Sequence, residues 1–495
     1  MIDLALRDVR VLDGSGAPAF EADVEVDAGR IRSVGRAGSA RREIDGHGAC
    51  LAPGFIDTHA HDDGAFLRHP RLEFKIAQGV TSIVSGNCGF SAMPGAAERG
   101  GSGSGGILAG LPHAFADLKS YLDAVRERSP APNLMMLVGH NTVRDFVMGM
   151  ERREPTRTEL GDMRTHVERA MLQGACGFST GLIYRPGRFS ATEELIALAQ
   201  VAASHSGLYA THLRDERDRL LDAVDEALRI GSESGAQVHI SHHKAAGKAN
   251  WGKVRESLQR VERARAGGQT VTLDVYPYTA GSGRMIEYFD LANPSRELAE
   301  VLRIATCPAF REFEGRMLVD IAAERGLDLP DAVRLILRAP LGDRTLCIHF
   351  IIDETDIETN LAHPDMMVGS DGIPDLSGKP HPRLFGTFPR VLARYVRERG
   401  VITLEEAVRR MTSVPARVFG MQDRGELREG AWADLVLFDP RTVQDLATYD
   451  DPKREPRGIE LVVVNGAIAY ESGRHTGAGS GKALRYRRSA LGDAD

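Results

Sequence analysis

Six side chains that could hold or serve a metal ion stand directly after short apolar segments of this sequence. They are His59, His61, Cys88, His212, His242 and Asp371. A single histidine or free cysteine is more often structural than ligating. The coincidence of such residues at the ends of successive segments is what favours a metal site. Imidazole, thiolate and carboxylate together suit Zn²⁺ or a similar borderline metal.

A metal in such a site would make the chain a hydrolase. It would polarise the carbonyl of an amide or ester and lower the pKa of a bound water to about 7. Asp371 could take the proton from that water and return it to the leaving amine. The alternative for Asp371 is a loop or cap aspartate, but its place at the last segment end favours the general base.

The elements that would position these residues are eight short apolar segments separated by helix-like stretches. The segments cover residues 54–59, 80–85, 134–139, 175–180, 208–212, 237–242, 270–276 and 366–370. Residues 192–204, 220–234 and 251–266 have helical spacing and good helix formers. Strand–helix alternation predicts a parallel sheet, and eight units predict an α/β fold of the (β/α)₈ TIM-barrel type. A doubly wound open sheet is the alternative.

The predicted barrel explains why the reactive residues stand where they do. Active sites of this fold lie at the carboxyl ends of the strands, and the six candidates follow those ends. Residues i and i+2 of an extended strand project to the same side, so we expect His59 and His61 to point together.

Both ends of the chain are expected to form one small β-sandwich domain from residues 1–53 and 418–480. Short alternating runs fill the first fifty residues, and similar runs return around Asn465-Gly466, a strong hairpin signal. The barrel would then cover 54–417, with an inserted helical subdomain at about 284–365. Residues 481–495 are expected to be a tail.

Two glycine-rich segments stand outside this pattern. Residues 95–106 are expected to form a flexible loop, either a solvated linker or a mobile lid. Residues 477–482 resemble a phosphate loop superficially but lack its leading Gly and trailing Ser or Thr. We interpret them as part of a disordered tail.

Composition limits the classes of partner. The 495 residues carry a net charge of −7, which gives no reason to expect a nucleic acid. No apolar run approaches the roughly 18 residues of a membrane span. The five scattered cysteines and the lack of a visible secretory signal favour the reducing cytoplasm. Oligomeric state cannot be inferred from composition.

The chain resembles the amidohydrolase superfamily through Gly54-Phe55-Ile56-Asp57-Thr58-His59-Ala60-His61, which matches that superfamily's first-strand signature. Within it, the chain is similar to the N-acyl-D-amino-acid deacylases, also called D-aminoacylases. The closer match lies in Gly86-Asn87-Cys88-Gly89-Phe90-Ser91, in residues 177–184, in Ser241-His242-His243-Lys244, and in Gly369-Ser370-Asp371-Gly372 with His381-Pro382-Arg383. The likeness runs nearly from end to end.

This resemblance implies a metal arrangement. One zinc would be held by Cys88, His212 and His242, with His59 and His61 at a weaker second position. Asp371 would be the general base. Many amidohydrolases instead bridge two metals with a modified lysine after strand four; residues 175–180 contain no lysine, which fits the cysteine variant.

The resemblance also implies a small-molecule N-acyl-D-amino acid as partner. Its carboxylate would be surrounded by Lys244, Arg383, Tyr184 and Tyr276, with Ser282 a weaker candidate. This makes physical sense, because an arginine fork pairs bidentately with a carboxylate and a lysine adds a second charge.

Residues after Ser282 depart from the pattern of better-known members. Arg284 stands where we expect an aliphatic run beside the substrate side chain. It could pair with an acidic side chain, favouring N-acyl-D-glutamate or N-acyl-D-aspartate, or it could point to solvent. The preferred side chain therefore stays open.

The leading hypothesis is zinc-dependent hydrolysis of N-acyl-D-amino acids to a D-amino acid and a carboxylate. A hydantoinase- or dihydroorotase-like hydrolase of cyclic amides, or a dipeptide hydrolase, is an alternative. The missing lysine and the carboxylate-binding residues count against it. A third alternative is a non-catalytic binding protein, against which the complete set of ligands counts.

Overall fold

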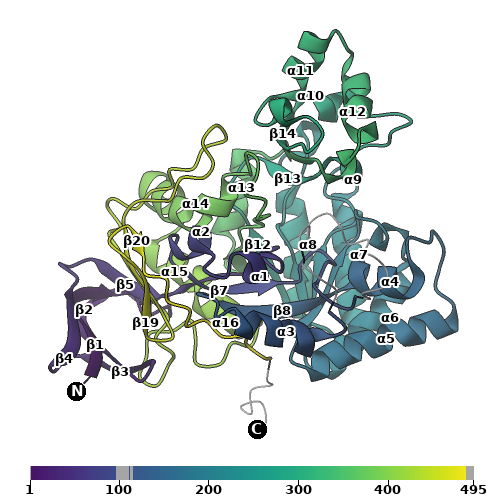
Figure 1. Ribbon diagram of the computed structural model, residues 1–495. Helices are drawn as coiled ribbons and strands as arrows, with labels where there is room; N and C mark the ends of the chain where they lie inside the picture. Colours follow the sequence, from purple (N-terminus) through teal and green to yellow (C-terminus); the bar gives the residue numbers. More distant parts are fainter. Residues whose placement is uncertain (1, 96–110, 112–114, 487–495) are drawn as a thin grey trace.

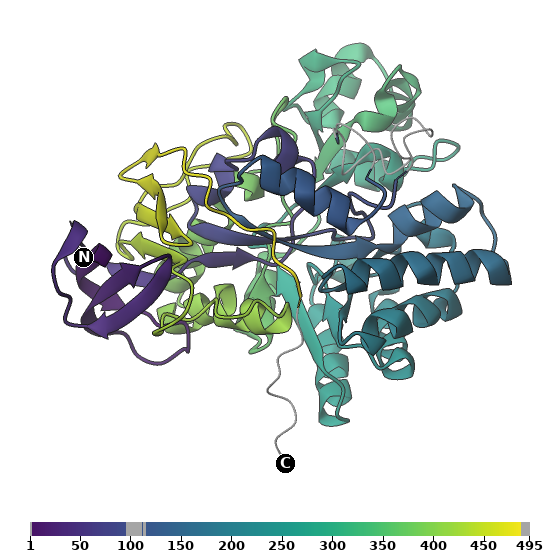
Figure 2. The same ribbon diagram turned by 60° about the horizontal axis from the view of Figure 1, so that its bottom comes forward.

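A computed structural model describes residues 2–95, 111 and 115–486 (Figures 1 and 2). A central barrel carries a small β-domain at one side and an inserted subdomain above it. Within the described residues, no helix is long and apolar enough to cross a membrane.

The eight predicted barrel strands are confirmed, and they form one parallel sheet in sequence order. They are β6 (Phe55–Asp57), β7 (Val80–Ser85), β8 (Asn133–Gly139), β9 (Gly177–Gly181), β10 (Leu208–His212), β11 (Val238–Ile240), β12 (Val271–Val275) and β16 (Met366–Val368). Nearly every residue in them is buried, as expected of strands covered on both faces.

The barrel closes where β16 meets β6. The Asp371 amide donates to the His59 carbonyl oxygen at 2.7 Å, and Ala60 bridges to Gly372 just beyond the strand ends. Beneath this seam the fully buried Lys75 donates to an Asp57 carboxylate oxygen at 2.6 Å. This pairing compensates two charges that would otherwise be costly in the interior.

Helices cover the outside of the barrel (Figures 1 and 2). Residues 192–204 and 220–234 are helical with the predicted bounds, and the third predicted helix begins at Val254. The helices are α1 (Ala65–Arg68), α2 (Glu73–Ile76), α3 (Leu118–Glu127), α4 (His140–Met148), α5 (Arg157–Leu172), α6 (Thr192–Ser204), α7 (Leu220–Ser234), α8 (Val254–Ala266), α13 (Glu354–Ala362), α14 (Arg383–Arg390), α15 (Leu404–Met411) and α16 (Ser413–Val418).

The insertion between β12 and β16 is not purely helical, which corrects the sequence prediction. It contains α9 (Met285–Tyr288), α10 (Arg296–Glu300), α11 (Leu318–Arg325) and α12 (Leu329–Arg338), together with an antiparallel sheet of β13 (Gly281–Arg284), β15 (Leu346–His349) and β14 (Leu302–Thr306). Its own apolar core includes Leu318, Ile336 and Cys347. Strand β13 connects this subdomain to the barrel directly after β12.

The small β-domain combines both chain ends in one mixed nine-stranded sheet, with purple and yellow strands together in Figure 1. Its strands are β1 (Ile2–Val11), β2 (Phe20–Asp27), β3 (Arg30–Gly35), β4 (Ala40–Asp45), β5 (Cys50–Pro53), β17 (Leu435–Phe438), β18 (Ile459–Val464), β19 (Ala467–Glu471) and β20 (Arg474–His475). The two ends join where β5 pairs with β17. Asn465 and Gly466 both have positive φ in the turn between β18 and β19, so the predicted hairpin is confirmed.

The glycine-rich segments have different outcomes. Apart from Gly95, the predicted loop 95–106 lies outside the described residues. The prediction of a disordered tail is wrong for residues 477–486, which pack along the barrel. The Leu134 amide donates to the Lys482 carbonyl oxygen at 2.9 Å, and the Tyr486 hydroxyl donates to the Ser206 carbonyl oxygen at 2.8 Å.

Candidate metal centre and substrate site

The sulfur of Cys88 lies at the centre of the predicted metal site. His59 Nε2 is 3.3 Å from Cys88 Sγ, His242 Nε2 is 3.5 Å away and His212 Nδ1 is 3.7 Å away. For Zn–S near 2.3 Å and Zn–N near 2.0 Å, tetrahedral angles place two ligand atoms about 3.5 Å apart. The spacing of these four side chains therefore suits a shared cation.

The ligand atoms fall into two overlapping groups. Cys88 groups with His212 and His242, and also with His59 and His61; within each group all ligand atoms lie within 4.8 Å of one another. All five side chains are buried. A thiolate shared by both groups could hold one metal or bridge two.

The predicted strand position of His59 and His61 is wrong. Strand β6 ends at Asp57, so neither histidine belongs to a strand and the alternation of an extended chain does not apply. The two rings still lie close, with centroids 5.4 Å apart.

Left-handed backbone turns place three of the predicted residues. Cys88, His242 and Asp371 have φ values of 53°, 36° and 49°. Each follows the end of its strand, and such conformations cost about 1–3 kcal/mol for residues other than glycine. Strain of this kind is found at sites that need a particular side-chain direction.

Charge at the centre keeps the thiol ionised. Burial would raise the pKa of Cys88, but the imidazoles of His59 and His242 hold it well below its usual range. A thiolate is the form of cysteine that binds metals.

Two buried carboxylates that the sequence analysis missed support the histidines from behind. Asp274 Oδ2 lies 3.6 Å from His59 Nδ1, opposite the ring nitrogen that faces Cys88. Glu216 Oε1 lies 3.0 Å from His242 Nδ1, and Oε2 lies 3.6 Å from His212 Nε2. The only signals in the sequence were an aspartate inside an apolar strand and a glutamate four residues after His212.

Asp371 lies between the histidines and the predicted anion-binding residues. One oxygen is 3.1 Å from His61 Nε2, and the other is 3.0 Å from Arg383 Nη2. Burial would raise the pKa of Asp371, but the Arg383 charge and the His61 hydrogen bond hold it well below its usual range. The carboxylate is therefore ionised and able to accept a proton.

The cations expected to bind the substrate carboxylate lie against one aromatic ring. Arg383 Cζ is 4.5 Å and Lys244 Nζ is 5.6 Å from the centre of the Tyr276 ring. Lys244 donates to Glu216 at 2.5 Å. Arg383 is only 1% exposed, and its Nε and Nη1 have no hydrogen-bond partner within the part of the chain that the structure describes. Buried donors of a charged group are costly to leave unpaired, so this fork is suited to an anionic ligand.

The remaining predicted residues surround this group. Tyr184 packs against His212 with ring centres 4.9 Å apart, and Ser282 accepts from Arg383 Nη2 at 3.3 Å through its backbone carbonyl. Arg284 pairs with the buried Glu287 at 2.8 Å. The sequence analysis also missed Tyr288, which is hydrogen-bonded to Tyr184.

The chain is similar to known proteins over nearly its whole length. A model of the amidohydrolase family matches residues 42–470. N-acyl-D-glutamate deacylase of Alcaligenes xylosoxydans xylosoxydans is 43% identical over 95% of this chain and 94% of its own. The crystal structure of N-acyl-D-glutamate deacylase from Bordetella bronchiseptica, complexed with zinc and a phosphonate mimic of the tetrahedral intermediate, is 41% identical, covers 98% of this chain and 99% of its own, and gives a TM-score of 0.91.

A third relative addresses the number of metals. A structure of D-aminoacylase described for its binuclear metal centre, with one-metal activation and second-metal attenuation, is 42% identical, covers 98% of this chain and all of its own, and gives a TM-score of 0.91. The chain therefore belongs to the amidohydrolase family and, within it, to the N-acyl-D-amino-acid deacylases, also called D-aminoacylases, which are metal-dependent amidohydrolases.

Proposed function

We propose that this chain hydrolyses N-acyl-D-amino acids to a D-amino acid and a carboxylate, with zinc as its metal. The observation that carries the proposal is the buried Arg383 fork beside a Cys–His cluster, since Nε and Nη1 of Arg383 find no partner among residues 2–95, 111 and 115–486. A linear substrate with a free carboxylate next to its amide matches both features. A simple hydantoin offers no carboxylate to Arg383, which disfavours the alternative of a hydantoinase-like enzyme.

Cys88, His212 and His242 would hold the tightly bound zinc. His59 and His61 would form a weaker second position that shares Cys88, and the overlap of the two groups of ligand atoms supports this division. Zinc bound there polarises the amide carbonyl and makes water a nucleophile near neutral pH.

Asp371 would be the general base and then the general acid. Its carboxylate takes a proton from the attacking water and returns it to the departing nitrogen, so the amine leaves neutral. Support comes from its ionised state and its contact with His61.

Arg383 and Lys244 would orient the substrate. Two N–H donors of Arg383 bind the substrate carboxylate while Lys244 and the Tyr184 and Tyr276 hydroxyls surround it. Fixing the carboxylate aligns the scissile amide with Asp371, and such positioning lowers the activation barrier.

We also propose that the enzyme prefers substrates with an acidic side chain, because of the residues on and near β13. Arg284 pairs with Glu287 at 2.8 Å, and Arg185 also approaches Glu287 at 3.8 Å, so two arginines lie beside this carboxylate. Both arginines lie close in sequence to proposed substrate-binding residues. Arg284 comes shortly after Ser282 on β13, and Arg185 directly follows Tyr184 on the loop after β9. The side-chain carboxylate of N-acyl-D-glutamate or N-acyl-D-aspartate would be attracted to these arginines.

The test is an activity panel with zinc-loaded protein. The panel contains the N-acetyl derivatives of D-glutamate, D-aspartate and D-methionine, their L-enantiomers and a hydantoin. Ninhydrin detects the amine released from the N-acetyl substrates, and loss of the ring is followed for the hydantoin. We expect turnover of the D-substrates with the acidic ones fastest. Turnover confined to L-substrates or to the cyclic ureide would refute the proposal.

The proposed compartment is the reducing cytoplasm. It is supported by five buried cysteines that all carry free thiols.

A further inference from the structure

We propose that Glu216 is a positioning residue that joins the metal centre to the residues that bind the substrate carboxylate. The inference rests on the proposed function, since it assigns Glu216 to that same site. It predicts that metal affinity and substrate affinity depend on one carboxylate.

The Glu216 carboxylate faces three residues of the site at once. Oε1 lies 3.0 Å from His242 Nδ1 and 2.5 Å from Lys244 Nζ. Oε2 lies 3.6 Å from His212 Nε2. The side chain is only 13% exposed, so water replaces few of these contacts. Two prospective metal ligands and one prospective substrate ligand therefore share a single anion.

Glu216 and Lys244 both lie beside Nδ1 of His242 and favour different positions of the ring proton. Nδ1 of His242 can donate to Glu216, or it can accept from Lys244 Nζ, which lies 2.8 Å away. Only the first arrangement leaves Nε2 unprotonated where it faces Cys88. A metal ligand needs that bare nitrogen, and outer carboxylates commonly fix it in this way.

His212 likewise has one ring nitrogen facing Cys88 and the other facing Glu216. Its Nδ1 faces Cys88 at 3.7 Å, and its Nε2 faces Glu216. Among the described residues His212 Nε2 has no hydrogen-bond partner, so the nearby negative charge of Glu216 is what favours a proton there. Both histidines of the tight group thus depend on Glu216.

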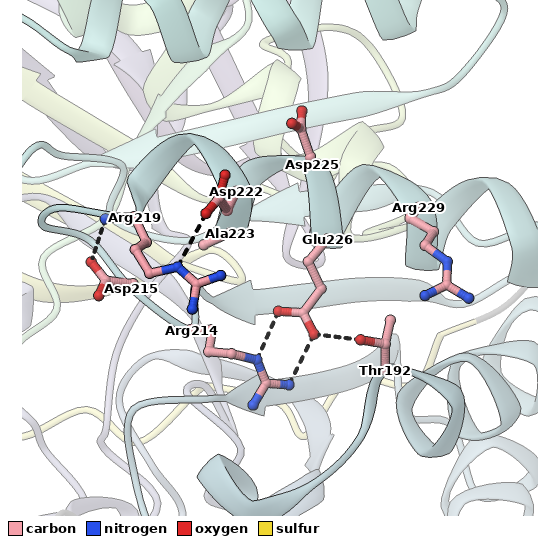
Figure 3. A pocket seen from close by; sticks show the side chains of 9 residues that line it. All are labelled: Thr192, Arg214, Asp215, Arg219, Asp222, Ala223, Asp225, Glu226 and Arg229. Atoms are coloured by element: carbon pink, nitrogen blue, oxygen red, sulfur yellow. Dashed lines mark hydrogen bonds and ion pairs between the residues drawn. The ribbon is translucent and has the colours of Figure 1, made fainter.

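The loop after β10, which carries Glu216, also has contacts on its outer side. Arg214 donates to both Glu226 oxygens at 2.8 and 2.9 Å, and Thr192 donates to the same carboxylate at 2.8 Å. Figure 3 shows this clamp in a surface cavity of about 460 Å³. On the inner side, the Glu216 carbonyl oxygen accepts from the Ala246 amide at 2.7 Å.

Loss of the Glu216 charge should therefore have two measurable effects. In E216Q the zinc Kd should rise about 10- to 100-fold, the range seen when an outer carboxylate is removed. Because Lys244 loses its anchor, KM should also rise about tenfold, while kcat at saturating zinc should change less. K244M should raise KM without changing the zinc Kd, and adding E216Q to it should raise KM little further.

The experiment is zinc competition against a chromogenic chelator, combined with kcat and KM at saturating zinc. The control is E226Q, which loosens the outer clamp but keeps every Glu216 contact and should leave both constants within about threefold of wild type. Thermal unfolding checks that each variant is folded, and E216D, with smaller effects, replaces E216Q if that variant is not.

Three results separate the possibilities. An unchanged zinc Kd and KM in folded E216Q would overturn the inference. Equal losses in E226Q would assign the effect to loop integrity and overturn it as well. If the wild-type protein hydrolyses no N-acyl-D-amino acid, the proposed function fails, yet zinc competition still tests the link between Glu216 and the metal.

Discussion

Replacement of Cys88 by alanine tests the metal centre most directly, because one sulfur is common to both groups of candidate ligands. Structural zinc held by four protein ligands binds with about 10–16 kcal/mol, or roughly 2.5–4 kcal/mol per ligand. Loss of one ligand should then weaken the tight position by roughly 10²- to 10³-fold. H61A removes a ligand of only one group, so it should leave the tight zinc in place.

The assay is zinc content after dialysis against a buffered chelator, with inductively coupled plasma detection. Cobalt substitution gives a second readout, since a thiolate–cobalt charge-transfer band requires the cysteine ligand. The matched control is C176S: Cys176 is equally buried beside the barrel strands but donates only to the Met136 carbonyl oxygen at 3.3 Å. C176S should retain both the zinc and the cobalt band.

The reasoning is refuted if C88A retains wild-type zinc and the charge-transfer band. It is also refuted if C176S loses as much zinc as C88A, since the loss would then reflect a disturbed barrel rather than a missing ligand.

Three further substitutions test other parts of the structure. D371N should lower kcat about 10²- to 10⁴-fold with unchanged zinc content, and a kcat near wild type would exclude Asp371 as the base. R383M should lower kcat/KM on N-acyl-D-amino acids at least about 10²-fold, because hydrogen bonds of about 1.5–3 kcal/mol each are lost. An equal loss on an N-acyl amine without a carboxylate would contradict the role of Arg383 in binding the substrate carboxylate. K75M leaves Asp57 and Asp62 without their cation, so the free energy of unfolding in urea should fall by about 3–5 kcal/mol. An unchanged unfolding midpoint would show that Lys75 and these aspartates do not stabilise the barrel seam.

The barrel could be predicted from the sequence because its strands are buried on both faces. Strands β7 and β10 have the predicted bounds, since each is a short apolar run between turn residues. The inserted sheet could not be predicted in the same way. Its first strand, β13, contains Gly281 and Gly283, which have low strand propensity, and it is held by pairing with the distant β15.

The clustering of the candidate metal ligands could be predicted for a related reason. Each follows a recognisable strand, and strand ends converge in a barrel whatever the length of the connections. Glu216 could not be found this way, because Arg-Asp-Glu-Arg-Asp reads as a solvated surface loop. Its burial comes with contacts to His242 and Lys244, which are distant in the sequence and which only the folded barrel brings beside it.

The sheet that joins the chain ends also constrains how this protein is made. Strand β5 is complete before the barrel begins, yet its partner β17 follows the whole barrel. At translation rates of about 5–20 residues per second, the first strands wait tens of seconds on the ribosome for that partner. During this interval they offer unpaired edges to other nascent chains. Slower, cooler expression or abundant chaperones should therefore raise the yield of folded protein.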